Sequence, residues 1–212
     1  CDIWRSKDAG LWELPDEQHY TSSKMGCWHA LDRAVHLSEQ GMIPGIADRW
    51  VTERDRIAEW IRDHCWSEAK QAYVWYPGTD QLDASVLLHA GSPCTDDARM
   101  SSTIDALRSE LGAGDHLYRY SGMQTVEGTF VACSFWVVNA LAHIGREDEA
   151  SDLMDRLVTS ANDVGLWAEM VDPHRTPDRG TTMHLGNFPQ GLSHLALINS
   201  ALTLARGHDH TA

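Results

Sequence analysis

The chain has 212 residues and a formal net charge of −14, from 31 acidic and 17 basic side chains. A chain of this length can bury most of its apolar surface in one core, so we expect a single domain. The acidic balance and the lack of a basic block argue against nucleic acid and anionic membrane surfaces as partners. Nine tryptophans stand against five tyrosines and three phenylalanines, and indole rings serve equally as core residues and as platforms for sugar rings.

The cysteine pattern bears on the compartment. The odd number and the lack of a CxxC pair are typical of reduced thiols, so we expect a cytoplasmic protein. The five cysteines are Cys1, Cys27, Cys65, Cys94 and Cys133. No signal peptide is recognisable, and the longest apolar run, residues 130–142, is too short to span a bilayer. For a chain that begins with Cys rather than Met we expect a processed or truncated protein, with a lipoprotein-type cysteine as the alternative.

Helical periodicity dominates the first part of the chain. Apolar residues recur at helical spacing between Thr21 and Gly41, which predicts a helix with Thr21 or Ser22 as its N-cap and Gly41 as its end. Residues 50–65 predict a second, amphipathic helix, with Glu53 and the charged residues around it largely on the solvent side.

The middle of the chain contains a weak strand signal and a clear helix. Residues 72–76 form the one segment with β-strand composition, and a short helix is predicted over residues 82–89. Residues 100–111 carry apolar side chains at i, i+4, i+7 and i+11, with two aspartates before them and Gly112 after them. This pattern predicts an amphipathic helix.

The last part of the chain is again helical. Residues 129–144 are apolar nearly all round, as expected of a helix enclosed by others, and residues 147–160 are amphipathic. A last helix is predicted to begin near Pro189. It carries, at helical spacing, the mainly apolar residues Leu192, Leu195, Ala196, Asn199 and Leu202. Antiparallel helices joined by long loops predict an all-α protein, a layered helical toroid in which an outer ring covers an inner one, with the chemistry on the loops.

Two glutamates follow tryptophans in loops of similar sequence. Glu13 ends the segment "GLWE" and Glu169 ends "GLWAE". Hydrolysis of a glycosidic bond needs two carboxyl groups, one protonated and one ionised, and an apolar ring raises the pKa of a carboxyl group beside it. Although a single exposed Glu is more often an ordinary surface residue, the pair predicts an acid and a base.

Other side chains offer competing chemistries. The twelve histidines include no HExxH or paired-ligand spacing, so no metal site is expected. Cys27 or Cys133 paired with a histidine would make a cysteine hydrolase, but both lie in apolar helical segments, where thiols are normally inert. Asn187 and Gln190, in "GNFPQ", are expected to cap the last helix rather than to face a pocket.

Segments spread along the chain resemble the family 15 glycoside hydrolases, which include prokaryotic glucoamylases and bacterial trehalases. The similarity runs from about Ala9 to about Ala201. In order, the segments are "DAGLWELPDEQHYTSSKMGCWHALDRAVHLSEQG", "DQLDASVLL", "LYRYSG", "EGTFVACSFWVVNALAHIGREDEA", "ANDVGLWAEMVDP" and "LGNFPQGLSHLALINSA".

This resemblance implies an (α/α)6 barrel and hydrolysis of α-glucosidic bonds with inversion at the anomeric carbon, without a cofactor or a metal. Glu13 matches the general acid and Glu169 the general base. Leu11 and Trp12 match residues that wall the glucose subsite, and Arg119 matches an arginine that hydrogen-bonds sugar hydroxyls. An inverting reaction requires the two carboxyl groups to lie roughly 6.5–9.5 Å apart, with a water between them.

The chain also departs from the family pattern. Met170 stands where bacterial relatives often have a second Glu after the base, and Ser121 stands where they often have Asp. Family members usually carry an N-terminal β-sandwich and early barrel helices that have no counterpart here. Residues 1–212 are therefore interpreted as a partial catalytic domain, the C-terminal portion of the barrel.

Three functional hypotheses follow. The first is an inverting glucoamylase or α-glucosidase, and the second is a trehalase that uses the same two carboxyl groups. The third is a non-catalytic piece that needs its missing half or a homo-oligomer, because an incomplete toroid exposes the apolar sides of its inner helices.

Overall fold

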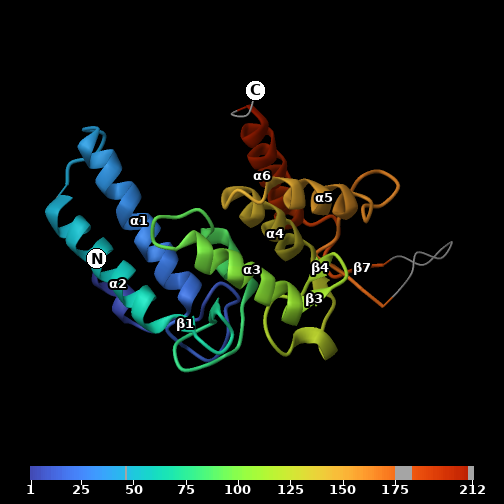
Figure 1. Ribbon diagram of the computed structural model, residues 1–212, viewed down its shortest axis with the longest axis horizontal. Coiled ribbons are helices and arrows are strands. Elements are labelled where there is room, and N and C mark those ends of the chain that lie inside the picture. The colour runs from blue at the N-terminus through green and yellow to red at the C-terminus, as the bar shows by residue number, and fades with distance from the viewer. Residues whose placement is uncertain (46, 175–182, 210–212) are drawn as a thin grey trace.

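The computed structural model describes residues 1–45, 47–174 and 183–209, which are mainly helical (Figure 1). The α-helices are α1 (Thr21–Glu39), α2 (Ala47–His64), α3 (Asp97–Leu111), α4 (Val131–His143), α5 (Glu147–Val158) and α6 (Gly191–Asp209). Three 3-10 helices accompany them: η1 (Asp2–Arg5), η2 (Ala84–His89) and η3 (Met123–Thr125). None of the helices in the described ranges combines the length and the apolar character needed to cross a membrane.

Short antiparallel strand pairs join the loops. Strand β1 (Trp66–Ser67) pairs with β2 (Ala72–Tyr73), and β3 (Gly112–Ala113) pairs with β4 (His116–Leu117). A three-stranded sheet has the order β5 (Thr129–Phe130), β6 (Met170–Val171), β7 (His184–Leu185). The prediction that residues 72–76 alone have strand character is therefore wrong. Each of these strands has only two residues, which is too short for an alternating pattern of apolar and polar side chains to show in the sequence. The paired loops also meet only in the folded chain.

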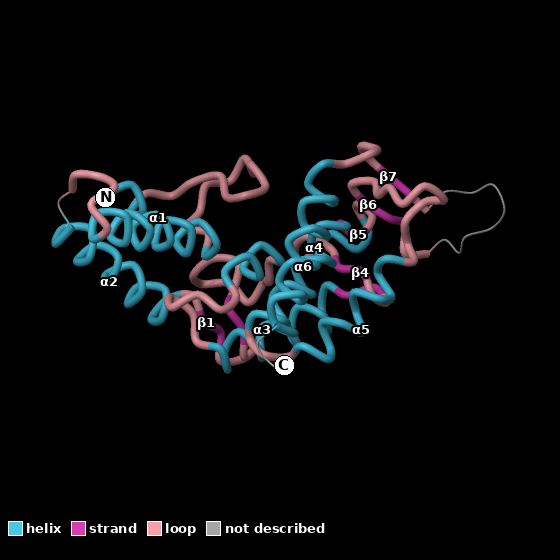
Figure 2. The backbone as a smooth tube through the Cα atoms, turned by 90° about the horizontal axis from the view of Figure 1, so that it is seen from above, coloured by secondary structure: helices cyan, strands magenta, loops and turns pink. Residues whose placement is uncertain are grey.

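The helices form an open arc. Figure 2 shows α1 and α2 as one limb and α4, α5 and α6 as the other, with α3 between them. Within the limbs, α1 packs against α2, and α4 packs against both α5 and α6. The 3-10 helix η2, which occupies most of the predicted helix over residues 82–89, contacts α1, α3 and α4 and so joins the two limbs.

The first helix begins and ends close to its predicted bounds. Its N-cap is Tyr20, which makes no side-chain cap bond, so the predicted cap at Thr21 or Ser22 is wrong. Both of these side chains are buried in the first turn of the helix instead. Gly41, at φ +69°, follows the helix as predicted, and the N–H groups of Gly41 and Met42 bond back to carbonyls of the last turn.

Glu53 on α2 does not face solvent as predicted. Its side chain is buried and accepts hydrogen bonds from Trp4 Nε1 at 3.0 Å and Arg56 at 2.7 Å, while Arg5 forms an ion pair at 2.7 Å. These contacts, that of Arg5 above all, lower the pKa of Glu53 to about 2. The carboxylate thus fixes η1 on α2, a contact that the amphipathic pattern of α2 could not predict.

The helices at the centre of the molecule follow their apolar patterns. On α3, Asp96 caps the helix by accepting the Arg99 N–H at 2.8 Å, and the predicted apolar row is completely buried. This row is Met100, Ile104, Leu107 and Leu111. Helix α4 is buried on all sides as predicted, although residues 129–130 belong to β5 rather than to the helix.

Helix α6 is only partly covered. It begins at Gly191, two residues after Pro189, and of its predicted apolar row Ala196 is buried. Four larger side chains of the helix are between 41% and 59% exposed in the described structure. They are Leu192, Leu195, Ile198 and Leu202, and we refer to them as the α6 leucine row.

Candidate active site

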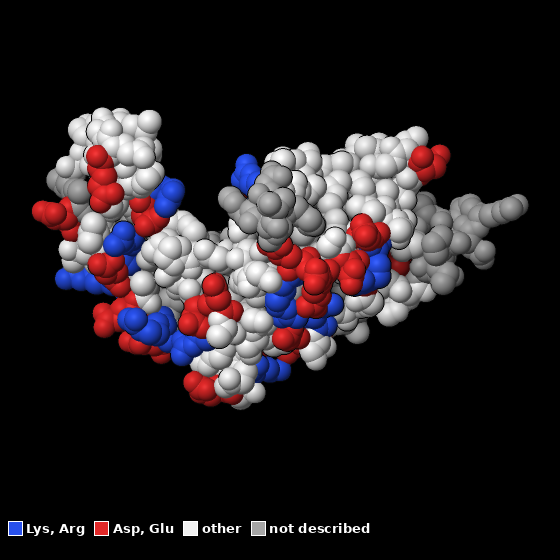
Figure 3. All heavy atoms as spheres, turned by 45° about the horizontal axis from the view of Figure 1, so that its top comes forward, with Lys and Arg blue, Asp and Glu red and all other residues white. Residues whose placement is uncertain are grey.

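A cleft of about 470 Å³ lies between the limbs, and all five predicted site residues line it. Figure 3 shows the molecule hollowed between the limbs, with charged side chains gathered mainly below the hollow in that view. The lining residues are Leu11, Trp12, Glu13, Leu88, Arg119, Phe130, Trp136, Glu169, Leu192, Leu195, Ala196 and Asn199. The structure therefore brings together predicted site residues that lie as much as 158 positions apart in the sequence, the separation of Leu11 and Glu169 (169 − 11).

Glu13 lies in a tight turn at the rim of this cleft. It has a positive φ of +51°, a conformation that is unfavourable for a residue other than glycine. The turn is closed by the Leu14 N–H, which donates to the Ala9 carbonyl at 2.8 Å. Gly10 is required because its φ is +69° and a Cβ atom there would lie 2.8 Å from the Tyr20 ring. The "GLWE" segment is thus a turn that presents an exposed carboxyl group.

An ion pair between buried Lys24 and half-buried Asp8 holds this turn against α1, and no local sequence pattern predicts it. Asp8 Oδ1 accepts the Gly10 N–H at 2.8 Å and the Ser23 hydroxyl at 2.7 Å. Lys24 is 1% exposed, and its Nζ contacts Asp8 Oδ2 at 3.3 Å and donates to the Ser6 carbonyl at 2.7 Å. Because a buried ammonium group needs such partners, the loop before Glu13 cannot leave α1 without a large cost.

Trp12 forms an aromatic wall of the cleft. Its ring lies 5.6 Å from that of Phe130 and 6.0 Å from that of Trp136, measured between centroids. The Arg119 guanidinium lies 5.2 Å from the same ring centroid, a cation–π arrangement. The indole Nε1 donates to Asp83 Oδ1 at 2.9 Å, so both the face and the polar edge of the ring are held.

The similarity between "GLWE" and "GLWAE" does not extend to their tryptophans. Trp167 is buried in the core, where its ring packs edge to face against Phe135 and His194, and it is not among the residues that line the cleft. Of these two tryptophans, only Trp12 therefore lines the cleft.

Glu169 is held by the loop between β7 and α6. Its Oε2 accepts the Asn187 backbone N–H at 3.2 Å and the Asn187 Nδ2 at 3.1 Å. Gly186, at φ +73°, lies against the same oxygen, since a Cβ atom there would come within 2.6 Å of it. Asn187 was expected to cap α6, and that expectation is wrong, because its side chain binds the carboxylate. The Gln190 N–H donates to the Trp167 carbonyl at 3.0 Å.

Arg119 is oriented by a second residue that sequence reasoning missed. Its Nε donates to Glu127 Oε1 at 2.7 Å, and its Nη2 donates to Glu127 Oε2. This two-point contact raises the pKa of Arg119, against the effect of burial. A guanidinium has five N–H bonds, so three remain for a ligand in the cleft. Glu127 lies in the "EGTF" segment, whose position in the family pattern was the available signal.

The two departures from the family pattern have identifiable surroundings. Met170 lies in β6, and its Cε would be 3.1 Å from a Cβ atom at Gly186, on the loop that holds Glu169. The Ser121 hydroxyl accepts the Leu82 N–H at 2.8 Å and donates to Glu110. Both residues therefore support segments that carry site residues.

The cysteine-hydrolase alternative has no support in this geometry. Cys133 is completely buried, and burial raises its pKa well above the usual value. Burial likewise raises the pKa of Cys27. A thiol must ionise to act as a nucleophile, so neither is activated. Within the described ranges, no three His, Cys, Asp or Glu side chains are arranged to hold a metal ion.

Comparison with known proteins decides the family. The sequence profile of the glycosyl hydrolases family 15 matches residues 1–202. The chain belongs to this family. A trehalase of Mycobacterium tuberculosis is 37% identical over 215 residues, which cover 97% of this chain and 31% of the relative. A trehalase of Thermoplasma volcanium is 28% identical over 94% of this chain and 32% of the relative. The family 15 chain thus spans about a third of the length of these relatives.

Solved structures show the same fold. A wild-type glycosidase superposes with a TM-score of 0.76 at 17% identity, covering 92% of this chain and 54% of that one. A variant glycosidase in complex with glucose gives a TM-score of 0.78 at 16% identity, over 95% of this chain and 56% of that one. The arc of helices therefore corresponds to somewhat more than half of a known glycosidase fold.

Proposed function

We propose that this chain carries the acid and the base of an inverting α-glucoside hydrolase whose substrate is trehalose. The observation that supports this most directly is that Glu13, Glu169 and Arg119 line one cleft. In the proposed reaction Glu13 gives its proton to the glycosidic oxygen. Glu169 removes a proton from a water, whose oxygen attacks the anomeric carbon from the face opposite the leaving group. The C–O bond to the leaving glucose breaks as the new one forms.

The other lining residues suit a sugar. Trp12 presents a ring against which the apolar face of a pyranose can pack, and Leu11 extends this wall. The free N–H groups of Arg119 are donors for sugar hydroxyls. Both Asn187 donors reach Glu169 Oε2, so Oε1, which accepts no hydrogen bond from a described residue, is the oxygen that faces the water.

The relatives favour trehalose over starch-type substrates. Glucoamylase was the first of the sequence-based hypotheses, but the curated relatives described above are trehalases. Initial rates on trehalose, maltose and isomaltose distinguish the two substrates. If the complete polypeptide that contains these residues hydrolyses maltose faster than trehalose, the glucoamylase hypothesis is supported and the trehalase proposal is contradicted.

We also propose that the arc is completed to an (α/α)6 toroid by helices outside these 212 residues. The chain covers 54–56% of the matched solved chains, and the α6 leucine row is exposed. A complementing segment of the same polypeptide would bury the part of that row that does not line the cleft, Ile198 and Leu202. In its absence the isolated chain would be inactive and would associate with itself, as the third hypothesis states.

The assignment of the two glutamates is tested by Glu13→Gln and Glu169→Gln in the complete polypeptide. Each is expected to lower kcat on trehalose by about 10²–10⁴-fold while calorimetric binding of trehalose persists. The matched control is Glu17→Gln, an exposed glutamate of the same loop. With α-glucosyl fluoride, whose leaving group needs no proton, Glu13→Gln recovers activity and Glu169→Gln does not. Near-normal turnover of trehalose by either variant contradicts the role of that residue.

The stereochemistry provides an independent check. Inversion of trehalose releases one β-glucose and one α-glucose, which proton NMR resolves before mutarotation. Two α-glucose molecules would indicate retention and would contradict the proposed mechanism.

A further inference from the structure

Asp83 is a buried carboxyl group behind the cleft wall. Its residue is 3% exposed, and it precedes η2. On one side its backbone forms an isolated β-bridge with Tyr120, and the next N–H, that of Ala84, donates to the Arg119 carbonyl at 2.8 Å. The segment that carries Asp83 is therefore joined directly to the segment that carries Arg119.

The hydrogen bonds of Asp83 extend to two further parts of the cleft. Oδ1 accepts Trp12 Nε1 at 2.9 Å and the Ser85 N–H at 2.9 Å, and Oδ2 accepts the Ser85 hydroxyl. The Ser85 contacts cap η2, whose residue Leu88 lines the cleft. Trp12 directly precedes Glu13. The Asp83 carboxyl group thus holds the turn of the proposed acid and the start of η2. The backbone of the same segment holds the segment that carries Arg119.

We infer that Asp83 is a positioning residue for the proposed acid, because its hydrogen bond to the Trp12 indole holds the turn that presents Glu13. Its catalytic consequence rests on the proposed function, whereas its effect on Trp12 does not. Glu13 occupies a strained backbone conformation, which persists only while the surrounding contacts impose it. The hydrogen bond from Trp12 to Asp83 is one of these contacts.

The hydrogen bond depends on the protonation state of Asp83. Burial raises the pKa of Asp83 to about 6, although Ser85, Trp12 and the charge of Arg119 act in the opposite direction. Because Oδ1 already accepts two N–H groups, a proton is accommodated on Oδ2, and the Ser85 hydroxyl turns to accept it. Trp12 then donates to a neutral carbonyl oxygen, a weaker acceptor than a carboxylate.

The other titratable groups that face Asp83 keep their charge near this pH. They are Tyr20 at the start of α1, Arg119 on the adjoining segment, and Cys133 on α4. Phenols and thiols ionise above neutrality, burial raises the pKa values of Tyr20 and Cys133 further, and the contact with Glu127 raises that of Arg119. A transition at Trp12 near pH 6 therefore reports on Asp83.

The first experiment uses the complete polypeptide and no substrate. The indole N–H resonance of Trp12, assigned by its loss in Trp12→Phe, is followed by ¹⁵N NMR between pH 4.5 and 7.5. The resonance is expected to shift with a midpoint near 6 in the wild type and to be independent of pH in Asp83→Asn, which keeps the accepting oxygen and replaces Oδ2 by an amide donor. In Glu13→Gln the shift is expected to remain.

Three outcomes would overturn the inference: a resonance that does not move in the wild type, a shift that persists in Asp83→Asn, or a shift that is lost in Glu13→Gln. The last would assign the titration to Glu13 itself.

The second experiment measures the consequence for turnover in the complete polypeptide. Asp83→Ala is expected to lower kcat about a hundredfold, as misplacement of a reacting group does, with a smaller rise in KM because Trp12 also forms a wall of the sugar site. Asp83→Asn is expected to stay within about tenfold of the wild type and to lose the inflection near pH 6 in kcat/KM. A normal kcat for Asp83→Ala contradicts the positioning role, whereas a normal kcat for Glu13→Gln contradicts the proposed function and leaves the NMR result valid.

Discussion

Asn187 donates two hydrogen bonds to one oxygen of Glu169, from its backbone N–H and from its side chain. In return its carbonyl oxygen accepts the Glu169 backbone N–H at 2.9 Å. The residue next to the contact, Gly186, has a positive φ and no room for a Cβ atom. The two loops that meet here therefore fix both the position and the rotation of the carboxylate.

Asn187→Ala removes the side-chain donor and keeps the backbone contact. We expect kcat on trehalose to fall about tenfold, the effect of about 1.4 kcal/mol, which is near the value of a hydrogen bond to a charged group. KM should change little, because Asn187 does not line the cleft. The control is Gln40→Ala, an exposed amide that bonds His36. A normal kcat for Asn187→Ala at an unchanged melting temperature would show that Glu169 is oriented by other groups.

The sequence predicted those features that a local pattern encodes. The bounds and the buried face of α3 follow from its apolar spacing, its cap at Asp96 and the helix-ending Gly112. The site residues Glu13 and Glu169 came from their loop contexts together with the family resemblance. The pattern that predicts α3 lies within one short segment, and the pattern that predicts the two glutamates lies in short loop motifs and in the order of several segments along the chain.

The partners of the site residues were not predictable in this way. Asp83 lies 71 residues from Trp12, and Asn187 lies 18 residues from Glu169. The burial of Glu53 likewise depends on Trp4, 49 residues away. Such contacts are created when loops meet in the fold, and a polar residue that ends up buried by a distant segment looks like a surface residue in its own segment.

His89 predicts how stability depends on pH. Its imidazole is buried between α1 and η2, with Ser22 Oγ 3.1 Å from Nε2 and no hydrogen-bond partner at Nδ1 among the described residues. Burial first, and then the neighbouring His29, lower the pKa of His89 from 6.5 to about 3. Between these values the unfolded chain binds the proton and the folded chain does not. The contribution to stability is therefore complete above pH 6.5 and is lost as the pH falls.

The expected slope is up to about 1.4 kcal/mol of unfolding free energy per pH unit. Urea unfolding of the wild type and of His89→Gln is compared from pH 7.5 to 4.5, with the exposed His64→Gln as control. Asp83 acts in the opposite direction, since its raised pKa makes the folded state bind the extra proton below pH 6, but this effect is common to all three proteins. Equal slopes in the wild type and His89→Gln would mean that His89 is protonated in the fold.

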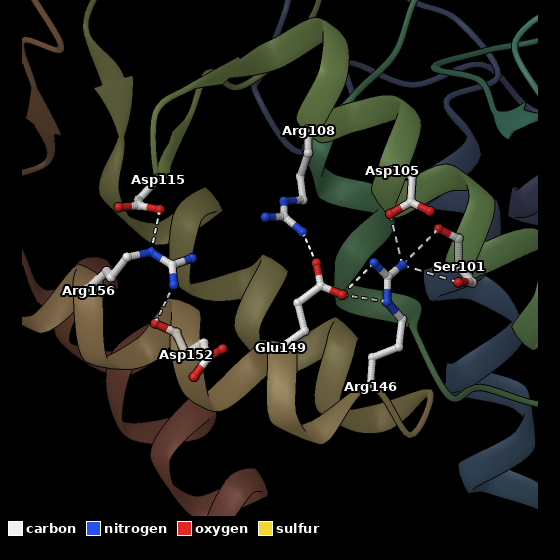
Figure 4. Close-up of polar contacts among 8 residues, drawn as sticks. All are labelled: Ser101, Asp105, Arg108, Asp115, Arg146, Glu149, Asp152 and Arg156. Carbon is white, nitrogen blue, oxygen red and sulfur yellow. Dashed lines mark hydrogen bonds and ion pairs between the residues drawn. The ribbon is translucent and has the colours of Figure 1, made fainter.

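An ion-pair network joins α3 to α5 (Figure 4). Glu149 accepts from Arg108 and from Arg146 Nε, the latter at 2.8 Å, and Arg146 also bonds Asp105 at 2.9 Å and the Ser101 hydroxyl at 3.2 Å. Burial raises the pKa of Glu149, but the hydrogen bonds from the two arginines outweigh it, so that the net shift is downward. One carboxylate therefore bridges two cations from different parts of the chain.

Glu149→Ala is expected to lower the unfolding free energy by about 1 kcal/mol, because it leaves both arginines without a shared partner. The control is Arg156→Ala, which breaks a separate ion pair with Asp115 whose side chains are 47% and 41% exposed and should cost less than about 0.5 kcal/mol. Urea unfolding at low and high salt measures both. Equal costs for the two variants would mean that the network adds nothing beyond a surface pair.

The α6 leucine row predicts opposite effects of one change in two contexts. In the isolated chain Ile198 and Leu202, which do not line the cleft, are 51% and 50% exposed, and an apolar patch of this kind favours association. The double variant Ile198→Ser/Leu202→Ser should shift the isolated chain toward monomer in analytical ultracentrifugation. The control, Asp155→Ser on the exposed side of α5, should not.

In the complete polypeptide the proposed toroid buries the same side chains. There the double variant should lower the unfolding free energy by about 1.5–3 kcal/mol for each of the two side chains that loses its packing, while Asp155→Ser again has little effect. An isolated wild-type chain that is a monodisperse monomer and hydrolyses trehalose would contradict the proposal. So would a complete polypeptide that tolerates both serines without loss of stability, because the row would then face solvent in both contexts.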